Sequence, residues 1–385
     1  MDVLVNPWTP SDEYDYIKLI DKFGTNAIDE ELIKRFENVT GKPAHYFLKR
    51  GIFYSHQDLD LILDEKEAGR PIYIYTGRGP SSKTMHLGHL IPFIFTKYLQ
   101  DALDAFVIIQ LSDDEKYFFG KDNKLKLEEY NKLCRENAKD IIACGFDVNK
   151  TYIFSNLESM GGSLYRNNAI IMKNVSGNVI NNIYGLNLSN NIGQLTWPCF
   201  QSGPAFSTSF PEIFGEKPIY SLVPMAIDQA PYFRMCRDVH KKLGCPKPAV
   251  IHSQFLPSLD KPNGKMSSSN NVISTIFLDT KPEDVHNILK RRAFSGAPET
   301  LEELRSKGAD LSVDVSYKYL TYFMEDEDML GEVARKYSCG EMTTGEIKKI
   351  TADVICKIIE NHNRHKSGVS DEIINMFFDN NKKFK

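Results

Sequence analysis

The chain has 385 residues, a formal net charge of −4, 42% hydrophobic residues and 25% charged residues. This is the composition of an ordinary soluble protein, and the length suits two or three domains of roughly 150 residues. The net charge excludes an overall positive field, so a nucleic acid would have to meet a local basic patch. Because apolar runs are shorter than the roughly 18 residues of a membrane span and the N-terminus is acidic, we expect a cytoplasmic protein with no membrane partner.

Residues 1–70 are polar with scattered apolar positions, and three segments within them have helical patterns. Acidic residues open the segments 11–23 and 28–41, as the helix dipole favours. Gly41 closes the second of these segments, and a third helical segment ends at Gly69. We therefore expect an N-terminal helical extension over residues 1–70 that packs on the following domain.

From Pro71 onward, short apolar runs alternate with helical segments. The first apolar runs cover residues 72–75, 106–111 and 151–156, and two amphipathic segments separate them. This alternation predicts an α/β fold with a doubly wound parallel sheet over residues 71–269. Ligands bind such sheets beyond the carboxyl ends of the strands, which places residues 75–79 and 110–115 at one edge.

From about residue 275 the pattern becomes helical throughout. This change predicts a second, α-helical domain over residues 270–368, followed by a C-terminal helix within residues 369–385. The seven cysteines stand far apart and form no Cys-x-x-Cys pair, which argues against structural zinc and favours reduced, mostly buried thiols.

The stretch YTGRGPSSKTMHLGHL, residues 75–90, stands at the change from the first strand to a helix. His86 and His89 are three residues apart, so both face one side of the helix start and can donate to phosphate oxygens. Free N–H groups and the helix dipole also favour an anion there, and Gly88 lets a flat base lie against the backbone. The motif favours an ATP site that stabilises departing pyrophosphate; a helix with two ordinary histidines is the alternative.

A second motif, Lys265-Met-Ser-Ser-Ser269, follows a strand and Gly264. A lysine on a glycine-led loop can reach the β- and γ-phosphates of ATP in the transition state, with serines as further donors. Such a loop alone is usually only solvated, and Gly77-x-Gly79 alone is a weak nucleotide signal. The two motifs together, in this order, are a highly specific signal for an ATP site.

These motifs resemble the HIGH and KMSKS signatures of the class I aminoacyl-tRNA synthetases. The segments YTGRGPSS, MHLGHLIPFIFTKYLQD, DDEKYFF, AIDQAPYFRMCRDV and KMSSS are similar to the eukaryotic cytosolic tryptophanyl-tRNA synthetases, and the similarity runs from about residue 6 to the last helix. Two departures are the absence of the N-terminal appendage of animal members and a serine in KMSSS where that family often has alanine.

The resemblance implies a Rossmann-fold catalytic domain, a helical anticodon-binding domain and a homodimer. It implies a ligase that joins L-tryptophan to ATP as tryptophanyl-adenylate, releases pyrophosphate, and transfers tryptophan to the 3′ end of tRNA(Trp). Mg²⁺ is expected to arrive bound to the ATP phosphates. The candidates for contact with tRNA are basic residues of the helical domain and tail, namely Lys290, Arg291, Arg292, Lys348, Lys349, Lys382, Lys383 and Lys385.

The resemblance also implies roles for individual residues. For tryptophan, these are Tyr75 and Gln110 on the indole N–H, and Glu115, Gln201 and Gln229 on the amino and carboxylate groups. For ATP, they are Arg78, Gly79, His86, Gly88, His89, Lys265, Met266 and Ser267, and the catalytic set is His86, His89, Lys265, Ser267 and Ser268. An indole has one donor and a large apolar face, so an acceptor within aromatic walls fits it. Such a polar site rejects substrates that lack the matching group, so no editing domain is expected.

Structural roles are the alternatives for several of these residues. Tyr75 could be a core tyrosine, Gln110 a helix cap and Glu115 part of a solvated charged cluster, while Asp228 could bind ribose or brace its loop. Three other functions compete with the main interpretation: a tyrosyl-tRNA synthetase, a small-molecule nucleotidylyltransferase and a non-catalytic RNA-binding module. Gln110 argues against the first, the second motif and helical tail against the second, and intact His86, His89 and Lys265 against the third.

Overall fold

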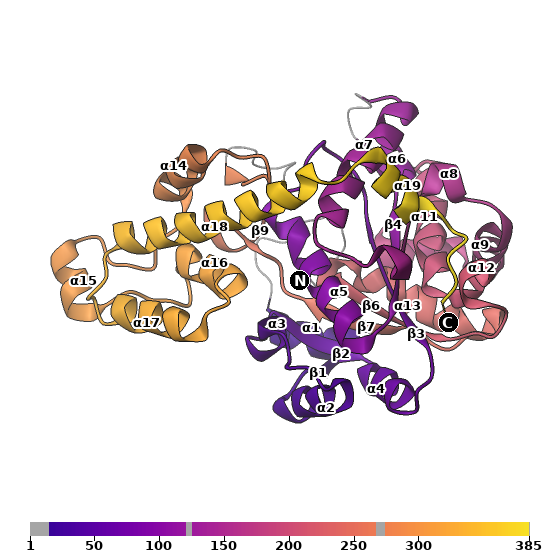
Figure 1. Cartoon of the computed structure of the whole chain (residues 1–385), viewed down its shortest axis with the longest axis horizontal. Helices are drawn as coiled ribbons and strands as arrows, with labels where there is room; N and C mark the ends of the chain where they lie inside the picture. The colour runs from indigo at the N-terminus through magenta and orange to yellow at the C-terminus, as the bar shows by residue number, and fades with distance from the viewer. Residues whose placement is uncertain (1–14, 121–124, 267–273, 385) are drawn as a thin grey trace.

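The computed structural model describes residues 15–120, 125–266 and 274–384, and within them a seven-stranded sheet forms the centre of the molecule (Figure 1). The strand order is β1-β2-β7-β6-β3-β4-β5, and the strands from β7 to β5 are parallel. The predicted α/β fold with a Rossmann-like, mostly parallel sheet is therefore confirmed. The strands are β1 (Asn26–Ala27), β2 (Phe53–Gln57), β3 (Ile72–Arg78), β4 (Phe106–Leu111), β5 (Thr151–Ser155), β6 (Tyr220–Ala226) and β7 (Ala249–Ser253).

Strands β1 and β2 are the main departure from the expected pattern of residues 1–70. The sequence indicated only helices there, but β2 pairs antiparallel with β7 and β1 pairs antiparallel with β2. The reason is burial of polar side chains, because Ser55 and His56 are both buried in β2 and interrupt the apolar pattern of a strand. Ser55 Oγ and His252 Nδ1 lie 3.1 Å apart, so the polar groups satisfy each other across the two strands.

The two faces of the sheet carry separate hydrophobic cores. Ile72 and Ile74 of β3 belong to one core, whereas Tyr73 and Tyr75 belong to the other, as the two-residue period of a strand requires. On the first face lie α2 (Glu30–Thr40), α3 (Tyr46–Lys49), α4 (Leu59–Glu67), α5 (Leu87–Leu103) and α7 (Leu127–Ile142). On the second lie α9 (Gly162–Asn174), α10 (Gly177–Tyr184), α11 (Ile192–Ser202), α12 (Pro211–Phe214) and α13 (Ala230–Val239).

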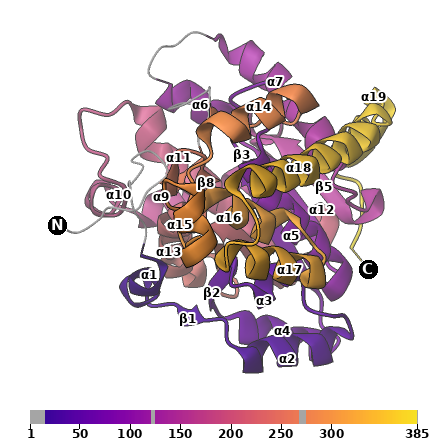
Figure 2. The same cartoon turned by 90° about the vertical axis from the view of Figure 1, so that its left-hand side faces the viewer.

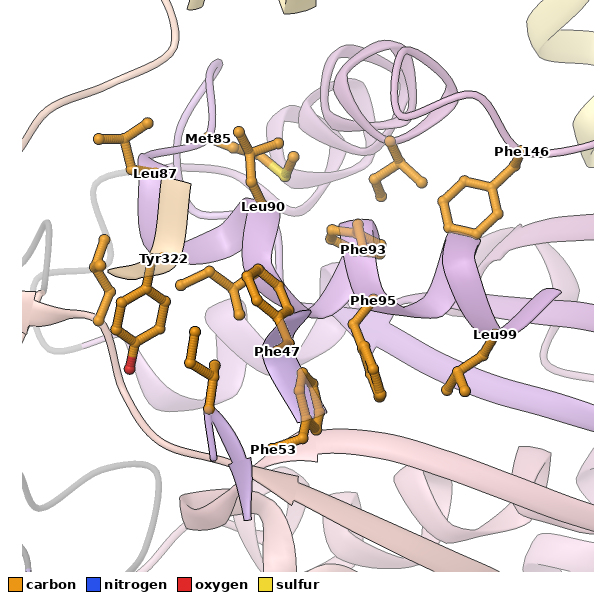
Figure 3. Packing of buried hydrophobic residues seen from close by; sticks show 14 of the residues in the cluster. Phe47, Phe53, Met85, Leu87, Leu90, Phe93, Phe95, Leu99, Phe146 and Tyr322 are labelled. Atoms are coloured by element: carbon orange, nitrogen blue, oxygen red, sulfur yellow. The ribbon is translucent and has the colours of Figure 1, made fainter. Parts of the chain in front are cut away.

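Helix α5 follows β3 and is held against the first face by large buried side chains (Figure 3). Phe95 stacks on Phe53 of β2 with ring centroids 3.8 Å apart, and Phe47 packs beside them. Burial of an aromatic side chain of this kind contributes roughly 1.5–3 kcal/mol. This packing fixes the first turn of α5 beside the carboxyl end of β3.

The C-terminal third is helical, as predicted, and its longest helix returns to the sheet (Figures 1 and 2). Helix α18 packs against α14 and α16 near one end and against α7 near the other, and α19 then packs on β5. The helices of this part are α14 (Pro282–Arg292), α15 (Leu301–Lys307), α16 (Val315–Phe323), α17 (Glu327–Ser338), α18 (Thr344–Ser367) and α19 (Asp371–Phe378).

Shorter elements connect these parts. A hairpin leads from the sheet toward the helical part, and among the described residues every helix is too short or too polar to cross a membrane. The remaining elements are α1 (Tyr16–Phe23), α6 (Asp113–Phe119), α8 (Asn156–Ser159), the hairpin strands β8 (Pro257–Ser258) and β9 (Lys261–Lys265), and short 3₁₀ turns at Val148–Lys150, Gly203–Ala205, Ser207–Ser209, Ile227–Gln229 and His240–Leu243.

A buried carboxylate joins α18 to α7. Asp140 Oδ1 lies 3.0 Å from His362 Nε2 and 2.8 Å from Lys366 Nζ, and Asp140 is fully buried. Burial would raise the pKa of Asp140, but the hydrogen bonds from His362 and Lys366 outweigh it and lower the pKa. The ionised form therefore holds the two helices together.

We predict that Asp140→Asn lowers the free energy of unfolding by about 3 kcal/mol at neutral pH, because it leaves the partner cation without its buried counter-charge. Urea denaturation monitored by circular dichroism measures this loss. Glu136→Gln on the same helix is the matched control, since the Glu136–Lys139 pair is partly exposed to solvent, and it should cost less than about 1 kcal/mol. Equal losses in the two variants would contradict the prediction.

Candidate active site

A cavity of about 710 Å³ opens at the carboxyl ends of β3, β4 and β6. This is where the strand order reverses, with β4 on one side of β3 and β6 on the other, and α/β sheets bind ligands at such points. All of the predicted site residues that the structure describes line this cavity. They are Tyr75, Arg78, Gly79, His86, Gly88, His89, Gln110, Glu115, Gln201, Gln229, Lys265 and Met266. Ser267 and Ser268 lie outside the described residues.

The two histidines form a stacked pair at the start of α5. Their ring centroids are 3.4 Å apart, and His89 Nδ1 accepts a hydrogen bond from the backbone N–H of His86 at 3.2 Å. Because Nδ1 of His89 is an acceptor, the neutral ring carries its proton on Nε2. Nδ1 of His86 is buried without a hydrogen-bond partner among the described residues, which is a polar atom available to a bound molecule.

Both rings are neutral at physiological pH. Burial lowers the pKa of His86 to about 3, and the charges of Arg78 and Lys265 add to the effect. Burial also holds the pKa of His89 well below its ordinary value, with further contributions from Arg78 and His86. Two stacked imidazolium rings would repel each other, so the close pair requires the neutral form.

Arg78 supplies a buried positive charge at the end of β3. Its Nε donates to Asn137 Oδ1 at 2.6 Å, whereas Nη2 is buried without a partner among the described residues. Burial lowers the pKa of Arg78 to about 10, although Asp140 and Glu115 oppose this shift. The guanidinium therefore stays charged at neutral pH and has a free donor, as an anionic ligand needs.

Two glycines of the junction stand close to side chains of the site. A Cβ at Gly79 would lie 2.2 Å from Oε2 of Glu115, so the carboxylate would have to move aside. A Cβ at Gly88 would lie 3.1 Å from Cε1 of His86 and would crowd the ring. Glycine at both positions therefore lets the backbone approach the carboxylate and the histidine without displacing them.

A polar pair stands deeper in the cavity. The Tyr75 hydroxyl donates to Gln110 Oε1 at 2.6 Å and lies 2.9 Å from the carbonyl oxygen of Gln201. Both side chains are buried, and Phe233 packs near Tyr75 with ring centroids 5.9 Å apart. This arrangement gives acceptor oxygens within an aromatic wall, as the indole argument anticipated.

Further polar side chains lie around the Tyr75–Gln110 pair. Gln201 Nε2 donates to Gln229 Oε1 at 3.1 Å, and Gln229 Nε2 donates to Asp228 Oδ1 at 3.3 Å. Glu115 accepts from Ser112 Oγ at 3.2 Å and lies 3.4 Å from Lys116 Nζ. Glu115 is buried, so the solvated cluster that served as its alternative does not describe it.

Lys265 is held by an acidic and an aromatic partner. Its Nζ lies 2.5 Å from Asp228 Oδ2 and 4.6 Å from the ring centroid of Phe255. Asp228 is buried, whereas the Lys265 side chain is one-third exposed. The lysine thus reaches the cavity wall from β9 in the absence of any ligand.

The sequence analysis missed three residues of this site. Asn156 is the last residue of the third predicted strand and lies just after β5, at the same edge as Gln110, a position that the parallel pattern could have identified. Asp114 was grouped with charged neighbours that usually face solvent, yet it is buried. Phe255 gave no signal, because an aromatic residue after a strand is most often part of the core.

The described residues contain no group of three or more histidine, cysteine, aspartate or glutamate side chains placed to hold a metal ion. All seven cysteines are free thiols, and Cys339 is the exposed one.

Comparison with known proteins identifies relatives of the whole chain. Residues 66–360 match the family described as tRNA synthetases class I (W and Y). The chain is 49% identical over 383 residues to the cytoplasmic tryptophan–tRNA ligase of Dictyostelium discoideum, which covers 97% of this chain and 94% of that protein. It is similar to a product-bound parasite tRNA synthetase with a TM-score of 0.92, at 48% identity over 96% of this chain and 97% of that one. The tryptophanyl-tRNA synthetase of Plasmodium falciparum superposes with a TM-score of 0.89, at 47% identity over 96% of each chain.

We predict that His86 remains neutral in the free protein from about pH 8 to about pH 5, because burial lowers its pKa to about 3. His89 should likewise be neutral at neutral pH, because burial holds its pKa well below the ordinary value. Ring-nitrogen NMR shifts, assigned with His86→Gln and His89→Gln, measure the protonation state. The chain unfolded in urea supplies the reference, in which histidines titrate near 6.5 on average, at about their unperturbed pKa. Protonation of His86 above about pH 5, or of His89 at neutral pH, would contradict the prediction.

Proposed function

The chain belongs to the class I tRNA synthetases for tryptophan and tyrosine, and we propose that the cavity at the end of β3 is where it acts on tryptophan and ATP. Its function is that of a cytoplasmic tryptophan–tRNA ligase. Tryptophan reacts with ATP to give tryptophanyl-adenylate and pyrophosphate, and the tryptophanyl group then moves to the 3′ end of tRNA(Trp). The observation that carries the assignment of the site is the meeting of Tyr75, Gln110 and the two histidines in one cavity.

The deeper polar pair is assigned to the substrate side chain. Gln110 Oε1 and the Tyr75 oxygen are acceptors, and the indole N–H is the one donor of the tryptophan ring. Glu115, an acceptor-only carboxylate when ionised, suits the ammonium group, and the amides of Gln201 and Gln229 suit the amino and carboxylate groups. A tyrosine substrate bound in this pocket would bring a phenol hydroxyl, which can donate or accept, in place of the indole N–H, which only donates.

The shallower part of the cavity is assigned to ATP. The substrate carboxylate attacks the α-phosphorus, the bond to the β-phosphate oxygen breaks, and pyrophosphate leaves with the negative charge. Arg78 Nη2 and the neutral N–H donors of His86 and His89 stand at the start of α5, where the helix dipole also favours this charge. Gly88 leaves room for the adenine, and Met266 lines the same wall.

Lys265 is assigned to the pyrophosphate. Its contacts with Asp228 and Phe255 keep it at the cavity wall, and an arriving triphosphate competes with Asp228 for its ammonium group. Ser267 and Ser268 follow it in sequence and are assigned as further donors. Mg²⁺ is expected as part of the ATP substrate, coordinated chiefly by the phosphates.

The parts of the chain are assigned by the same reasoning. We assign residues 71–269 to the catalytic domain and residues 270–368 to the anticodon-binding domain. Strands β1 and β2, from residues 1–70, complete the sheet of the catalytic domain, and α19 packs on β5 of the same sheet. Exposed cations on α14 and α18 can position tRNA through its phosphates, namely Lys290, Arg291, Arg292 and Lys349. Lys382 is a weaker candidate than the sequence indicated, because its ammonium bonds the backbone of Thr151 and lies over the Phe377 ring.

We predict that tryptophan alone drives ATP–pyrophosphate exchange, while tyrosine and the absence of an amino acid give background. The physical reason is that the buried acceptor pair matches the position of the indole N–H, and a site of this kind rejects a side chain that places no donor there by about 10⁴-fold or more. Lys265→Met should reduce kcat by about 100-fold, since it removes a charge that acts on the leaving group, and should change the KM for tryptophan less than about twofold.

The control for this variant is Lys261→Met, which changes an exposed lysine of the same hairpin and should leave exchange near the starting value. Exchange with tyrosine would overturn the roles of Tyr75 and Gln110. Absence of exchange with every amino acid, in folded protein that binds tRNA, would overturn the assignment of the cavity.

A homodimer is also proposed, on the basis of exposed apolar side chains on one side of the molecule. Leu188 is 98% exposed, Ile192 is 72% exposed and Tyr165 is 51% exposed. They come from α9, α11 and the loop before α11, and α9 and α11 pack together at the right of Figure 1. Apolar groups of this size are usually covered, and a second copy of the chain is the occupant that the family resemblance implies.

We predict that the double variant Leu188→Glu/Ile192→Glu is a monomer where the unmodified chain is a dimer, because two buried charges per protomer would have to lose their water. Sedimentation equilibrium measures the mass. Leu301→Glu on α15, which replaces a side chain that is 59% exposed elsewhere, should leave the dimer intact. A dimer that survives the double variant, or a monomeric parent, would contradict the proposal.

A further inference from the structure

Three polar side chains stand on the same face of the sheet at the ends of neighbouring strands. Tyr75 of β3 belongs to the face of Tyr73, and Gln110 of β4 belongs to the face of Phe106 and Ile108. Asn156 follows β5 and continues the face of Tyr152 and Phe154. The register pairs Gly77 with Gln110 and Gln110 with Phe154, so the three side chains form a diagonal row across the strands.

Hydrogen bonds join this row to a carboxylate on α6. Gln110 Nε2 donates to Asn156 Oδ1 at 2.8 Å, and Asn156 Nδ2 donates to Asp114 Oδ1 at 2.8 Å. At the other end of the row, the Tyr75 hydroxyl donates to Gln110 Oε1 at 2.6 Å. Asp114 thus lies two amide groups away from the acceptors that the proposed function assigns to the indole N–H.

The direction of every bond in the row follows from the carboxylate. An ionised carboxylate only accepts, so the amide of Asn156 must turn its NH₂ group toward Asp114 and its oxygen toward Gln110. That oxygen needs a donor, so Gln110 turns its NH₂ group toward Asn156 and its own oxygen toward Tyr75 and the cavity. If Asn156 turned over, its NH₂ group would face that of Gln110, and Gln110 would have to turn as well. The Gln110 NH₂ group would then meet the substrate N–H, and two donors would face each other.

We propose that Asp114, acting through Asn156, is a specificity-determining positioning residue: it fixes the amide orientation of Gln110 so that an acceptor faces the indole N–H of tryptophan. The inference rests on the proposed function, because it needs Tyr75 and Gln110 to be the indole contacts. Asp114 touches neither substrate nor ATP in this arrangement. Its effect reaches the substrate only through the direction of hydrogen bonds.

The burial of Asp114 supports this role. The residue is 8% exposed, and its other neighbours are the buried carboxylates of Asp113 and Glu115 and the indole N–H of Trp197, which donates to Asp114 Oδ1 at 3.2 Å. Burial raises the pKa of Asp114 to about 6, against the hydrogen bonds from Asn156 and Trp197 that lower it. Burial of an ionised carboxylate is unfavourable, and Asp114 has amide and indole donors beside it rather than a cation. A buried carboxylate of this kind is typical of a functional site.

A second acceptor limits the size of the effect. The carbonyl oxygen of Phe200 also accepts from Gln110 Nε2, at 3.2 Å, and favours the same orientation. Loss of Asp114 therefore weakens the preference for one orientation without removing it. We expect a moderate loss of discrimination, much smaller than the loss on removal of Gln110 itself.

The test is tryptophan-dependent ATP–pyrophosphate exchange with Asp114→Asn in the full chain at about pH 8. The competing substrate is benzothienyl-alanine, in which sulfur replaces the indole N–H and the ring size is kept. An asparagine at this position can donate or accept, so it no longer dictates how Asn156 is turned. We expect the KM for tryptophan to rise about tenfold and the preference for tryptophan over benzothienyl-alanine to fall about tenfold, while the KM for ATP changes less than about twofold.

The matched control is Asp113→Asn, the same chemical change at the neighbouring buried position. Asp113 accepts from Ser155 Oγ at 2.5 Å, Asn131 Nδ2 at 3.1 Å and the Leu157 N–H at 3.1 Å, and none of these groups leads to Gln110. This variant can lose stability, but its preference for tryptophan should remain that of the unmodified chain.

Asn156→Ala provides a second route if Asp114→Asn does not fold, because it breaks the same row at its middle. It should lower the preference for tryptophan, and the double variant with Asp114→Asn should lower it no further. Unchanged preference in both variants, with exchange by the unmodified chain intact, would overturn the role of Asp114 and leave the proposed function standing. Absence of tryptophan-dependent exchange in the unmodified chain would instead overturn the proposed function.

Discussion

The junction between β3 and α5 is the constraint on which the rest of the site depends. The strand is buried on both faces, so its carboxyl end is fixed, and α5 is fixed separately by the aromatic packing of Phe95 against Phe53. The chain between them passes close to Glu115 and to His86, and glycines at 79 and 88 make this approach without displacing either side chain. The histidines, Arg78 and the acceptor pair acquire their positions from these two rigid elements, as a site with a defined geometry requires.

Burial at this junction also decides which groups carry charge. The stacked histidines are neutral because burial lowers the pKa of both, and they therefore act as hydrogen-bond donors rather than as cations. The positive charge comes from Arg78, which is buried but remains protonated, and from Lys265, which Asp228 neutralises before a ligand arrives. Asp228 is the counter-charge of Lys265, and a triphosphate can replace it as the partner of that lysine.

The sequence was sufficient to predict the central strands, the helix after the first of them and twelve of the residues that line the cavity. Apolar runs identify buried parallel strands, and such strands necessarily bring their carboxyl ends to one edge. The residues that it did not reveal are polar groups inside the protein. Strand β2 contains Ser55 and His56, whose burial depends on a partner in β7, and Asp114 looks like part of a solvated acidic cluster until the fold covers it. Hydrogen-bond partners that are distant in sequence satisfy these buried polar groups, and a local sequence pattern contains no information about such partners.

The direction of a hydrogen bond is a further property that composition and spacing do not determine. An amide can present either end to its neighbour at nearly the same shape, so Gln110 and Asn156 alone do not define which group faces the cavity. A buried group that can only accept, such as ionised Asp114, removes this ambiguity for the whole row. On the other face of the sheet, Asp140 is also a buried acceptor. It accepts from His362, from Lys366 and, at 3.4 Å, from the backbone N–H of Met85 just before His86. Buried carboxylates on the two faces of the sheet thus act differently: Asp140 holds α18 to α7 through an ion pair, and Asp114 orients a row of amides that ends at the cavity.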